Sequence, residues 1–255
     1  MLAFRDKVVV VTGANGGIGS AIAQAFVARG ALVALVGRRL NALVDTAKEL
    51  DLPEDRLWYG VADLSDSQEV ESLGRNILEY YGRIDILIHA AGSYSAGAIE
   101  DSSFAEHDMM QAVNLRAPMV LTKALLPSLR STRGQIAFLN SSLGRAARGG
   151  VASYAASKHA LAAFADSLRD EMNPMGIRVL SMFIGRTASA MQQKVHALEG
   201  RPYRPEHLLQ PEDVASALVD ALRLDRTAEI TNLEMRPMRS PWCRRHGEGT
   251  GSLQD

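Results

Sequence analysis

The chain has 255 residues and a formal net charge of -1 at pH 7, and 47% of its residues are hydrophobic. This length is enough for one large α/β domain, and the balanced charge argues against a nucleic-acid-binding or membrane-surface protein. The single cysteine, Cys243, excludes an internal disulfide framework and fits a reducing cytoplasm. No apolar run approaches the roughly 20 residues of a membrane span. The N-terminus runs directly into a valine-rich strand at 8–11, so we expect no signal peptide and a cytoplasmic protein.

Short β-branched runs alternate with longer helical stretches along the chain. Strands are expected at 8–12, 32–36, 56–60, 84–89, 136–140 and 178–183, with a seventh near 229–233. Most of these runs are apolar throughout, which is typical of parallel strands that are covered on both faces. Helical patterns separate them at 20–29, 40–50, 67–81 and 109–130. The alternation predicts an α/β fold, a doubly wound parallel sheet of about seven strands with helices on both faces.

Two segments depart from this alternation. Residues 191–210 contain Gly200, Pro202 and Pro205, and we expect them to form an excursion over the sheet edge. The end of the chain has no periodicity and is expected to be a mobile tail at 241–255. Because no linker divides the rest, residues 1–240 are expected to form a single domain.

A glycine-rich turn follows the first expected strand and opens the first helix. Gly13 permits a tight turn, and Gly17 and Gly19 let backbone N–H groups and the helix N-terminus approach a pyrophosphate. Asn15 and Ile18 lie in the same turn and are included in the predicted site. The alternative is a purely structural strand-to-helix turn.

Tyr154 and Lys158 are four residues apart in an expected helix, so their side chains share one face. A phenol, with a pKa of about 10, exchanges protons poorly at neutral pH until a nearby cation stabilises its phenolate. Lys158 can supply that cation. The pair alone is a weak signal, because most such pairs merely decorate a helix surface.

Taken together, these motifs resemble the short-chain dehydrogenase/reductase family. The matching residues fall in the family's order and at its usual spacing over residues 5–238, and they are Thr12-Gly13-x-x-x-Gly17-Ile18-Gly19, Asp63, Ala91-Gly92, Asn114, Ser141 and Tyr154-x-x-x-Lys158. The resemblance implies a single-domain Rossmann-type fold and hydride transfer between a nicotinamide cofactor and a carbonyl or secondary alcohol.

The resemblance implies a catalytic set of Asn114, Ser141, Tyr154 and Lys158. Tyr154 would exchange a proton with the substrate oxygen, and Ser141 would donate a hydrogen bond to that oxygen. Lys158 would lower the tyrosine pKa and bind the nicotinamide ribose. Asn114 would hold a water in a proton relay, the alternative being a helix asparagine bonded to backbone. Ser141 is preferred to Ser142 because it begins a Ser-x-x-Gly step and lies thirteen residues before the tyrosine.

Cofactor choice depends on the residues just after the second strand, where a carboxylate would repel a 2′-phosphate. This chain has Gly37-Arg38-Arg39 there, and arginine can stack on adenine and bind phosphate, so NADP(H) is the predicted cofactor. NAD(H) can also be accommodated, and two solvated surface arginines are the alternative interpretation. The resemblance places Asp63 and Leu64 at the adenine ring, although Asp63 could instead cap the next helix.

Two stretches depart from the family's usual residues. His89-Ala90 stands where the family has Asn-Asn, before Ala91-Gly92, which remain in the expected cofactor site. His89 is expected to brace the sheet rather than to titrate.

The second departure follows the sixth strand, where Ile184 replaces the usual proline. Gly185 and Thr187 are still expected to meet the nicotinamide carboxamide and the pyrophosphate.

A small carbonyl or alcohol molecule is the predicted partner, and no metal site is predicted, because the histidines and methionines lack ligand spacing. The loop at 93–104 and the excursion at 191–210 should line the pocket. Arg145, Arg148 and Arg186 could meet an acidic substrate, although solvated loop arginines are favoured. A non-catalytic redox sensor or scaffold of the same fold is the alternative function, and the intact catalytic set argues against it.

The expected helix at 152–172 has two distinct faces. One carries apolar residues suited to packing on the sheet, namely Leu161, Ala165, Leu168 and Met172. The other carries small residues that allow a second helix to approach closely, namely Ala156, Ala160, Ala163 and Ser167. The family often pairs such helices across a two-fold axis, so the resemblance implies a homodimer or homotetramer. The alternative is an alanine-rich helix selected for its propensity.

Overall fold

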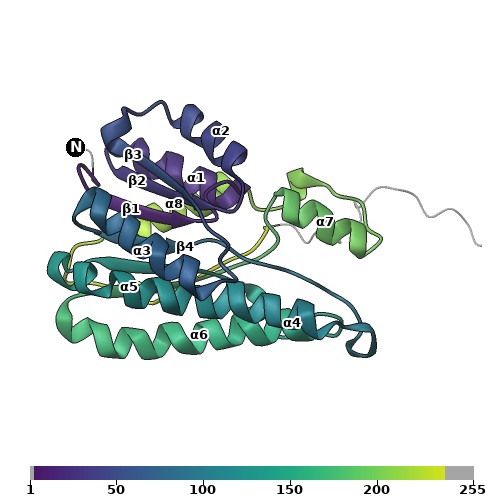
Figure 1. Ribbon diagram of the computed structural model, residues 1–255. Coiled ribbons are helices and arrows are strands. Elements are labelled where there is room, and N and C mark those ends of the chain that lie inside the picture. The colour runs from purple at the N-terminus through teal and green to yellow at the C-terminus, as the bar shows by residue number, and fades with distance from the viewer. Residues whose placement is uncertain (1–2, 239–255) are drawn as a thin grey trace, which may run out of the picture.

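A seven-stranded parallel sheet forms the centre of the computed structural model, which describes residues 3–238 (Figure 1). The strand order is β3-β2-β1-β4-β5-β6-β7, and every neighbouring pair is parallel. The strands are β1 Val8–Thr12, β2 Leu32–Gly37, β3 Leu57–Val61, β4 Ile86–His89, β5 Gln135–Ser141, β6 Arg178–Ile184 and β7 Asn232–Met235. The predicted doubly wound sheet is therefore confirmed, with strand ends shifted by a few residues.

Helices cover both faces of this sheet (Figure 1). One layer consists of α1 Gly17–Val27, α2 Leu40–Leu50 and α8 Pro211–Leu222. The other contains α3 Ser67–Tyr81, α5 Ala117–Thr132 and α6 Ala152–Met172, with α4 Phe104–Gln111 preceding α5. The helix predicted at 109–130 is thus two helices, which a π-helical segment at Ala112–Arg116 joins.

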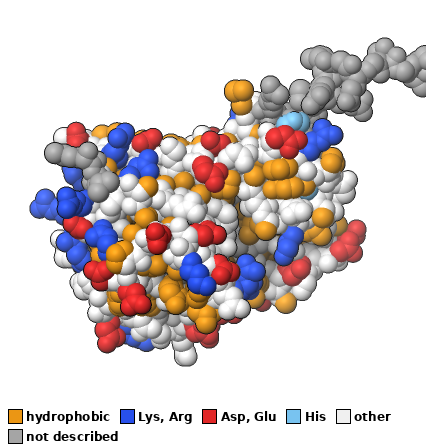
Figure 2. All heavy atoms as spheres, turned by 90° about the horizontal axis from the view of Figure 1, so that it is seen from above, with side chains coloured by type: hydrophobic (Ala, Val, Ile, Leu, Met, Phe, Trp, Pro, Cys, Tyr) orange, Lys and Arg blue, Asp and Glu red, His pale blue; other side chains and the backbone are white. Residues whose placement is uncertain are grey.

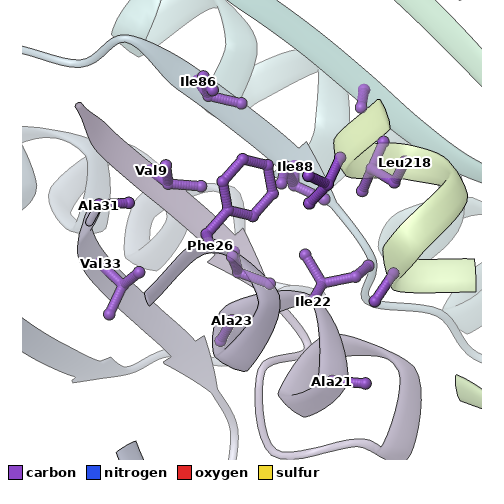
Figure 3. Close-up of a cluster of buried hydrophobic side chains, with 14 of the residues drawn as sticks. Val9, Ala21, Ile22, Ala23, Phe26, Ala31, Val33, Ile86, Ile88 and Leu218 are labelled. Carbon is purple, nitrogen blue, oxygen red and sulfur yellow. The ribbon is translucent and has the colours of Figure 1, made fainter. Parts of the chain in front are cut away.

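The valines of β1 divide between the two layers because successive side chains of a strand point to opposite faces. Val9 and Val11 pack in the layer of α1 and α8, whereas Val8 and Val10 pack in the layer of α3 and α5. Figure 3 shows Phe26 of α1 in the buried cluster between the sheet and helices α1 and α8. Full burial of such a side chain stabilises the fold by roughly 1.5–3 kcal/mol. This two-sided burial explains why the strand sequence is apolar throughout.

The strand order reverses at β1, which lies between β2 and β4. In an open parallel sheet, this position leaves a crevice beyond the carboxyl ends of the strands. The Oγ1 atom of Thr12, at the end of β1, accepts hydrogen bonds from the N–H groups of Ala90 (3.1 Å) and Ala91 (3.2 Å). These bonds hold the turn after β1 against the turn after β4.

The excursion expected at 191–210 does leave the sheet, but it carries a helix that the sequence analysis did not assign. Helix α7, Ala190–Leu198, lies beyond the carboxyl ends of the strands and apart from both helical layers (Figure 1). The predicted tail at 241–255, with Cys243, lies outside the described residues.

The distribution of surface charge and the lengths of the helices agree with the near-zero net charge and the lack of a long apolar run in the sequence. On the face that Figure 2 shows, acidic and basic side chains are interspersed rather than gathered into a field of one sign. Within residues 3–238, every helix is too short or too polar to qualify as a membrane span. A cytoplasmic location stays a prediction.

Candidate active site

A cavity of about 410 Å³ opens at the carboxyl ends of the central strands. Its walls come from the glycine-rich turn, the turns after β4, β5 and β6, and helices α6 and α7. It brings together eleven of the predicted site residues, namely Gly13, Gly17, Ile18, Gly19, Ala91, Gly92, Ser141, Tyr154, Lys158, Gly185 and Thr187. The other predicted residues lie outside its lining and are Asn15, Arg38, Arg39, Asp63, Leu64 and Asn114.

The glycine-rich turn is shaped by close backbone packing. Gly13 has a φ of +68°, and a Cβ atom there would stand 2.8 Å from the backbone of Ala91. A Cβ on Gly19 would overlap the carbonyl oxygen of Gly13. Helix α1 begins after Gly16, and within the described part of the chain no side-chain hydrogen bond caps its N-terminus. Such a helix end is an anion site, and the turn therefore fits the pyrophosphate of a dinucleotide.

Ser141 lies at the end of β5, where its Oγ atom accepts a hydrogen bond from the N–H of Leu143 (3.1 Å). The Ser-x-x-Gly step has a packing reason. A Cβ on Gly144 would stand 2.5 Å from Oδ1 of Asn140 and 3.0 Å from the carbonyl oxygen of Lys158. Asn140 also donates to that carbonyl through Nδ2 (3.0 Å), so it joins β5 to α6. Sequence reasoning missed Asn140, which has no recognisable motif of its own.

Tyr154 and Lys158 share the face of α6 that meets the cavity. Burial raises the pKa of Tyr154 to about 12, and a hydrogen bond with Ser141 partly offsets this rise. Burial also lowers the pKa of Lys158 to about 8, because the side chain is only 4% exposed. The expected lowering of the tyrosine pKa by Lys158 is absent. The Nζ atom instead donates to the carbonyl of Leu139 (3.1 Å) and lies 5.9 Å from the centre of the Tyr154 ring.

Asn114 lies in the π-helical segment, a feature that often marks functional sites. Its Oδ1 accepts from the N–H of Ser93 (2.7 Å), and its Nδ2 donates to the carbonyl of Ser93 (2.9 Å) and to Oγ of Ser157 (3.0 Å). The side chain therefore braces the turn after β4 against α6. The two bonds to Ser93 are the backbone bonds that the structural alternative expected, and the bond to the Ser157 side chain is an additional partner. The proposed water relay stays a prediction.

His89 braces the sheet, as the sequence analysis expected. Its Nε2 atom lies 2.9 Å from Oγ1 of Thr122, and its ring stacks on Phe138 with centroids 4.9 Å apart. Burial lowers the pKa of His89 to about 3, so the imidazole is neutral at physiological pH.

The residues predicted to select the cofactor lie at the ends of β2 and β3. Arg38 and Arg39 are exposed, and Gly37 packs against Asn15, whose Oδ1 would stand 2.8 Å from an added Cβ. Asp63 accepts from the N–H and the hydroxyl of Ser65, which lowers the pKa of Asp63, with a smaller effect from Arg38.

The alternative role for Asp63, as the cap of the following helix, is wrong. Asp66 caps α3 instead, accepting from the N–H groups of Gln68 and Glu69. Leu64 packs against the core beside α3 and α5.

The walls after β6 include residues that the sequence analysis did not select. Ser189 caps α7, because its Oγ accepts from the N–H of Gln192 (3.1 Å), and both residues line the cavity. The capping serine before an amphipathic stretch was the available signal. Thr187 is buried and donates to the carbonyl of Gly185 (3.2 Å). From the loop at 93–104, Tyr94 lines the cavity, with its ring centroid 4.8 Å from that of Tyr154.

The preference for solvated loop arginines is wrong for Arg186. Arg148 and Arg186 both line the cavity, and both bind the carboxylate of Glu199. Arg145 lies elsewhere, with its guanidinium 3.9 Å from the centre of the Phe183 ring. In residues 3–238 no group of three or more His, Cys, Asp or Glu side chains is arranged to hold a metal ion.

Comparison with known proteins identifies the family. A family profile described as short chain dehydrogenase matches residues 7–200. The chain is 39% identical over 182 residues to dehydrogenase/reductase SDR family member 7B of Xenopus laevis, covering 69% of this chain but only 56% of that relative. An uncharacterised oxidoreductase of Staphylococcus epidermidis is 30% identical over 239 residues, covering 93% of this chain and all of the relative.

A solved structure agrees with these relatives. The alcohol dehydrogenase of Thermococcus sibiricus, complexed with 5-hydroxy-NADP, is 27% identical with a TM-score of 0.82 and covers 93% of this chain and 99% of its own. The protein therefore belongs to the short-chain dehydrogenase/reductase family and has that family's Rossmann-like fold.

Proposed function

We propose that this protein is an NADP(H)-preferring oxidoreductase that interconverts a carbonyl compound and a secondary alcohol, with Tyr154 as general acid and base. The observation that carries the proposal is the convergence of Ser141, Tyr154 and Lys158 in one cavity, whose other end is the glycine cradle of α1. We extend the proposal to one catalytic domain over residues 1–240 and to a homodimer or homotetramer that pairs through α6.

The residues present fit a dinucleotide. The uncapped N-terminus of α1 would hold the pyrophosphate, and the exposed Arg38 would bind a 2′-phosphate. Lys158 would contact the nicotinamide ribose, and Gly185 and Thr187 would contact the carboxamide. When bound, the nicotinamide supplies the hydride for reduction.

At neutral pH, Tyr154 and most of Lys158 carry their protons in the protein without cofactor. With a pKa of about 12, the Tyr154 hydroxyl carries its proton and can donate it to the carbonyl oxygen. Ser141 orients that oxygen by a second hydrogen bond. With a pKa of about 8, Lys158 is mostly cationic at pH 7, and in this form it can donate hydrogen bonds to the nicotinamide ribose.

The experiment is an absorbance assay of NADPH and NADH oxidation against a mixed panel of ketones and aldehydes, with cofactor binding measured separately by calorimetry. The proposal expects turnover with at least one carbonyl compound and faster turnover with NADPH. Tight cofactor binding without oxidation by any member of the panel would favour the non-catalytic sensor instead.

A further inference from the structure

Three charged residues from separate parts of the chain meet beside the cavity. Arg148 precedes α6, Arg186 follows β6, and Glu199 follows α7. The Nη2 atom of Arg186 donates to both carboxylate oxygens of Glu199 (2.7 and 2.8 Å). The Nη2 atom of Arg148 donates to Oε1 of the same carboxylate (2.9 Å). Two guanidinium groups thus hold a single carboxylate by hydrogen bonds, and the Nε atom of Arg201 forms a longer ion pair with its Oε2 atom (4.0 Å).

This cluster differs from an ordinary surface ion pair, which is screened by solvent and contributes little to the stability of the fold. The side chains of Arg186 and Glu199 are only 16% and 19% exposed. The two arginines hold the pKa of the Glu199 carboxyl below its usual range, against the opposing effect of burial. Guanidinium groups match carboxylate and phosphate geometry better than any other side chain. The protein has therefore built an anion site and occupies it with its own carboxylate.

The anion site faces the reaction chamber. Among the described residues that line the cavity, the charged ones are Arg148, Lys158 and Arg186, and no carboxylate is among them. Tyr94 lies between Arg148 and Tyr154, because its ring packs against Tyr154 and its buried hydroxyl lies beside Arg148. The arginine pair and the catalytic hydroxyl are therefore separated by about one tyrosine side chain along the same wall.

We propose that Arg148 and Arg186 bind an anionic group, a carboxylate or a phosphate, on the substrate that Tyr154 reduces, with Glu199 occupying this position in the free protein. This inference rests on the proposed function. Glu199 can leave because it follows α7, outside both helical layers, and precedes Gly200, which has a φ of +64° and where an added Cβ atom would meet no described atom within 4 Å. The released carboxylate then faces solvent, while the substrate anion takes its two hydrogen-bonding partners.

The first test compares charged and neutral substrates of the same shape. 2-, 3- and 4-oxo acids are measured against their methyl esters, and dihydroxyacetone phosphate against dihydroxyacetone, in the wild type and in Arg148→Gln. We expect kcat/KM to favour the anion by about tenfold or more in the wild type, in line with charge-assisted hydrogen bonding, and the preference to collapse in the variant mainly through KM. A higher kcat/KM for the oxo acids than for their esters would identify the anion as a carboxylate. A higher kcat/KM for dihydroxyacetone phosphate than for dihydroxyacetone would identify it as a phosphate. Equal values for every pair would overturn the inference.

Arg145→Gln is the matched control, because Arg145 is a loop arginine of similar exposure that packs on Phe183 and pairs with Glu234 (3.4 Å) rather than with Glu199. Its anion preference should equal that of the wild type. If Arg145→Gln and Arg148→Gln reduced the preference equally, the effect would be a general charge effect and the inference would be wrong.

A second test does not depend on turnover. Calorimetry measures the binding of benzoate and of benzamide to the NADPH-loaded protein, in the wild type, Arg148→Gln and Glu199→Gln, each checked for an unchanged melting temperature. We expect benzoate to bind more tightly than benzamide, Arg148→Gln to abolish the difference, and Glu199→Gln to strengthen benzoate binding several-fold by removing the competitor. Equal binding of benzoate and benzamide, or weaker benzoate binding in Glu199→Gln, would overturn the inference. If benzoate binds but no carbonyl compound is reduced, it is the proposed function that fails.

Discussion

The Nδ2 group of Asn114 donates a 3.0 Å hydrogen bond to Oγ of Ser157, the residue directly before Lys158. Ser157 is fully buried, and its hydroxyl in turn donates to the carbonyl of Tyr154 (2.8 Å). One polar chain therefore joins the π-helical segment to the turn of α6 that carries both predicted catalytic residues. We interpret Ser157 as a positioning residue for that turn.

Ser157→Ala should reduce kcat several-fold with little change in NADPH affinity, because the variant loosens α6 without touching the glycine cradle. The free energy of unfolding should fall by about 1–2 kcal/mol, since a buried donor of Asn114 loses one partner. Urea unfolding, steady-state kinetics and calorimetry measure the three quantities. Ser131→Ala, an exposed serine near the end of α5, is the control and should be near neutral. A variant with wild-type kcat would show that the hydrogen bonds of Ser157 do not position the catalytic turn of α6.

Lys158→Met should change how stability depends on pH. The folded-state pKa of Lys158, about 8, lies below the ordinary lysine value of 10.5, so between these two pH values the unfolded state binds more protons. This residue therefore destabilises the fold most below pH 8, and that effect fades as the pH rises. The raised pKa of Tyr154 acts in the opposite direction only above about pH 10, where its unfolded form begins to ionise.

The measurement for this prediction is the free energy of unfolding at a series of pH values for both proteins without cofactor. We expect the variant to be more stable at pH 7, by up to about 3 kcal/mol, and to lack the rise in stability that Lys158 gives the wild type above pH 8. If the free energy of unfolding changed with pH in the same way in both proteins, burial would not perturb the pKa of Lys158.

Arg38→Ala should lower the preference for NADPH over NADH. The guanidinium is exposed at the end of β2, and a charge-assisted contact to a 2′-phosphate is worth about 1.5–3 kcal/mol, or roughly ten- to a hundredfold. The ratio of kcat/KM for the two cofactors measures this, and Arg39→Ala is the neighbouring control with the smaller expected effect. A wild type that prefers NADH, or an Arg38→Ala variant with an unchanged ratio, would contradict the assignment.

Ala163→Arg should break the proposed oligomer. On α6, Leu161, Ala165, Leu168 and Met172 are buried, as the sequence suggested. On the small-residue face, Ala156, Ala163 and Ser167 are exposed, and Ala160 is half-buried. An arginine at 163 places a bulky charge on the small-residue face without disturbing the core. Light scattering should show oligomers for the wild type and for Gln68→Arg, an exposed change on α3, and monomers for Ala163→Arg. A monomeric wild type would refute the pairing.

Much of the fold and the cavity could be predicted because the signals are local. A valine run followed by a glycine turn specifies β1 and the start of α1, and the four-residue step from Tyr154 to Lys158 places both side chains on one face. The Ser-x-x-Gly step was equally local, since Gly144 is required by contact with Asn140 just before it.

Long-range partners could not be predicted in this way. Asn114 binds Ser157, 43 residues further on, and Arg148 binds Glu199, 51 residues further on. Nothing in the sequence near either residue indicates its partner. The pKa of Tyr154 was mispredicted for the same reason, because burial and the direction of Lys158 toward Leu139 arise only from tertiary packing.

The most direct test of the account is the turnover of Tyr154→Phe on the best substrate of the wild type, with NADPH affinity and melting temperature measured alongside. The substitution removes only the hydroxyl, so the fold and cofactor binding should remain while kcat falls by roughly 10²–10⁴-fold, the usual contribution of a general acid. A variant that binds NADPH normally and keeps more than about half of the wild-type activity would contradict the assignment of Tyr154 as the proton donor.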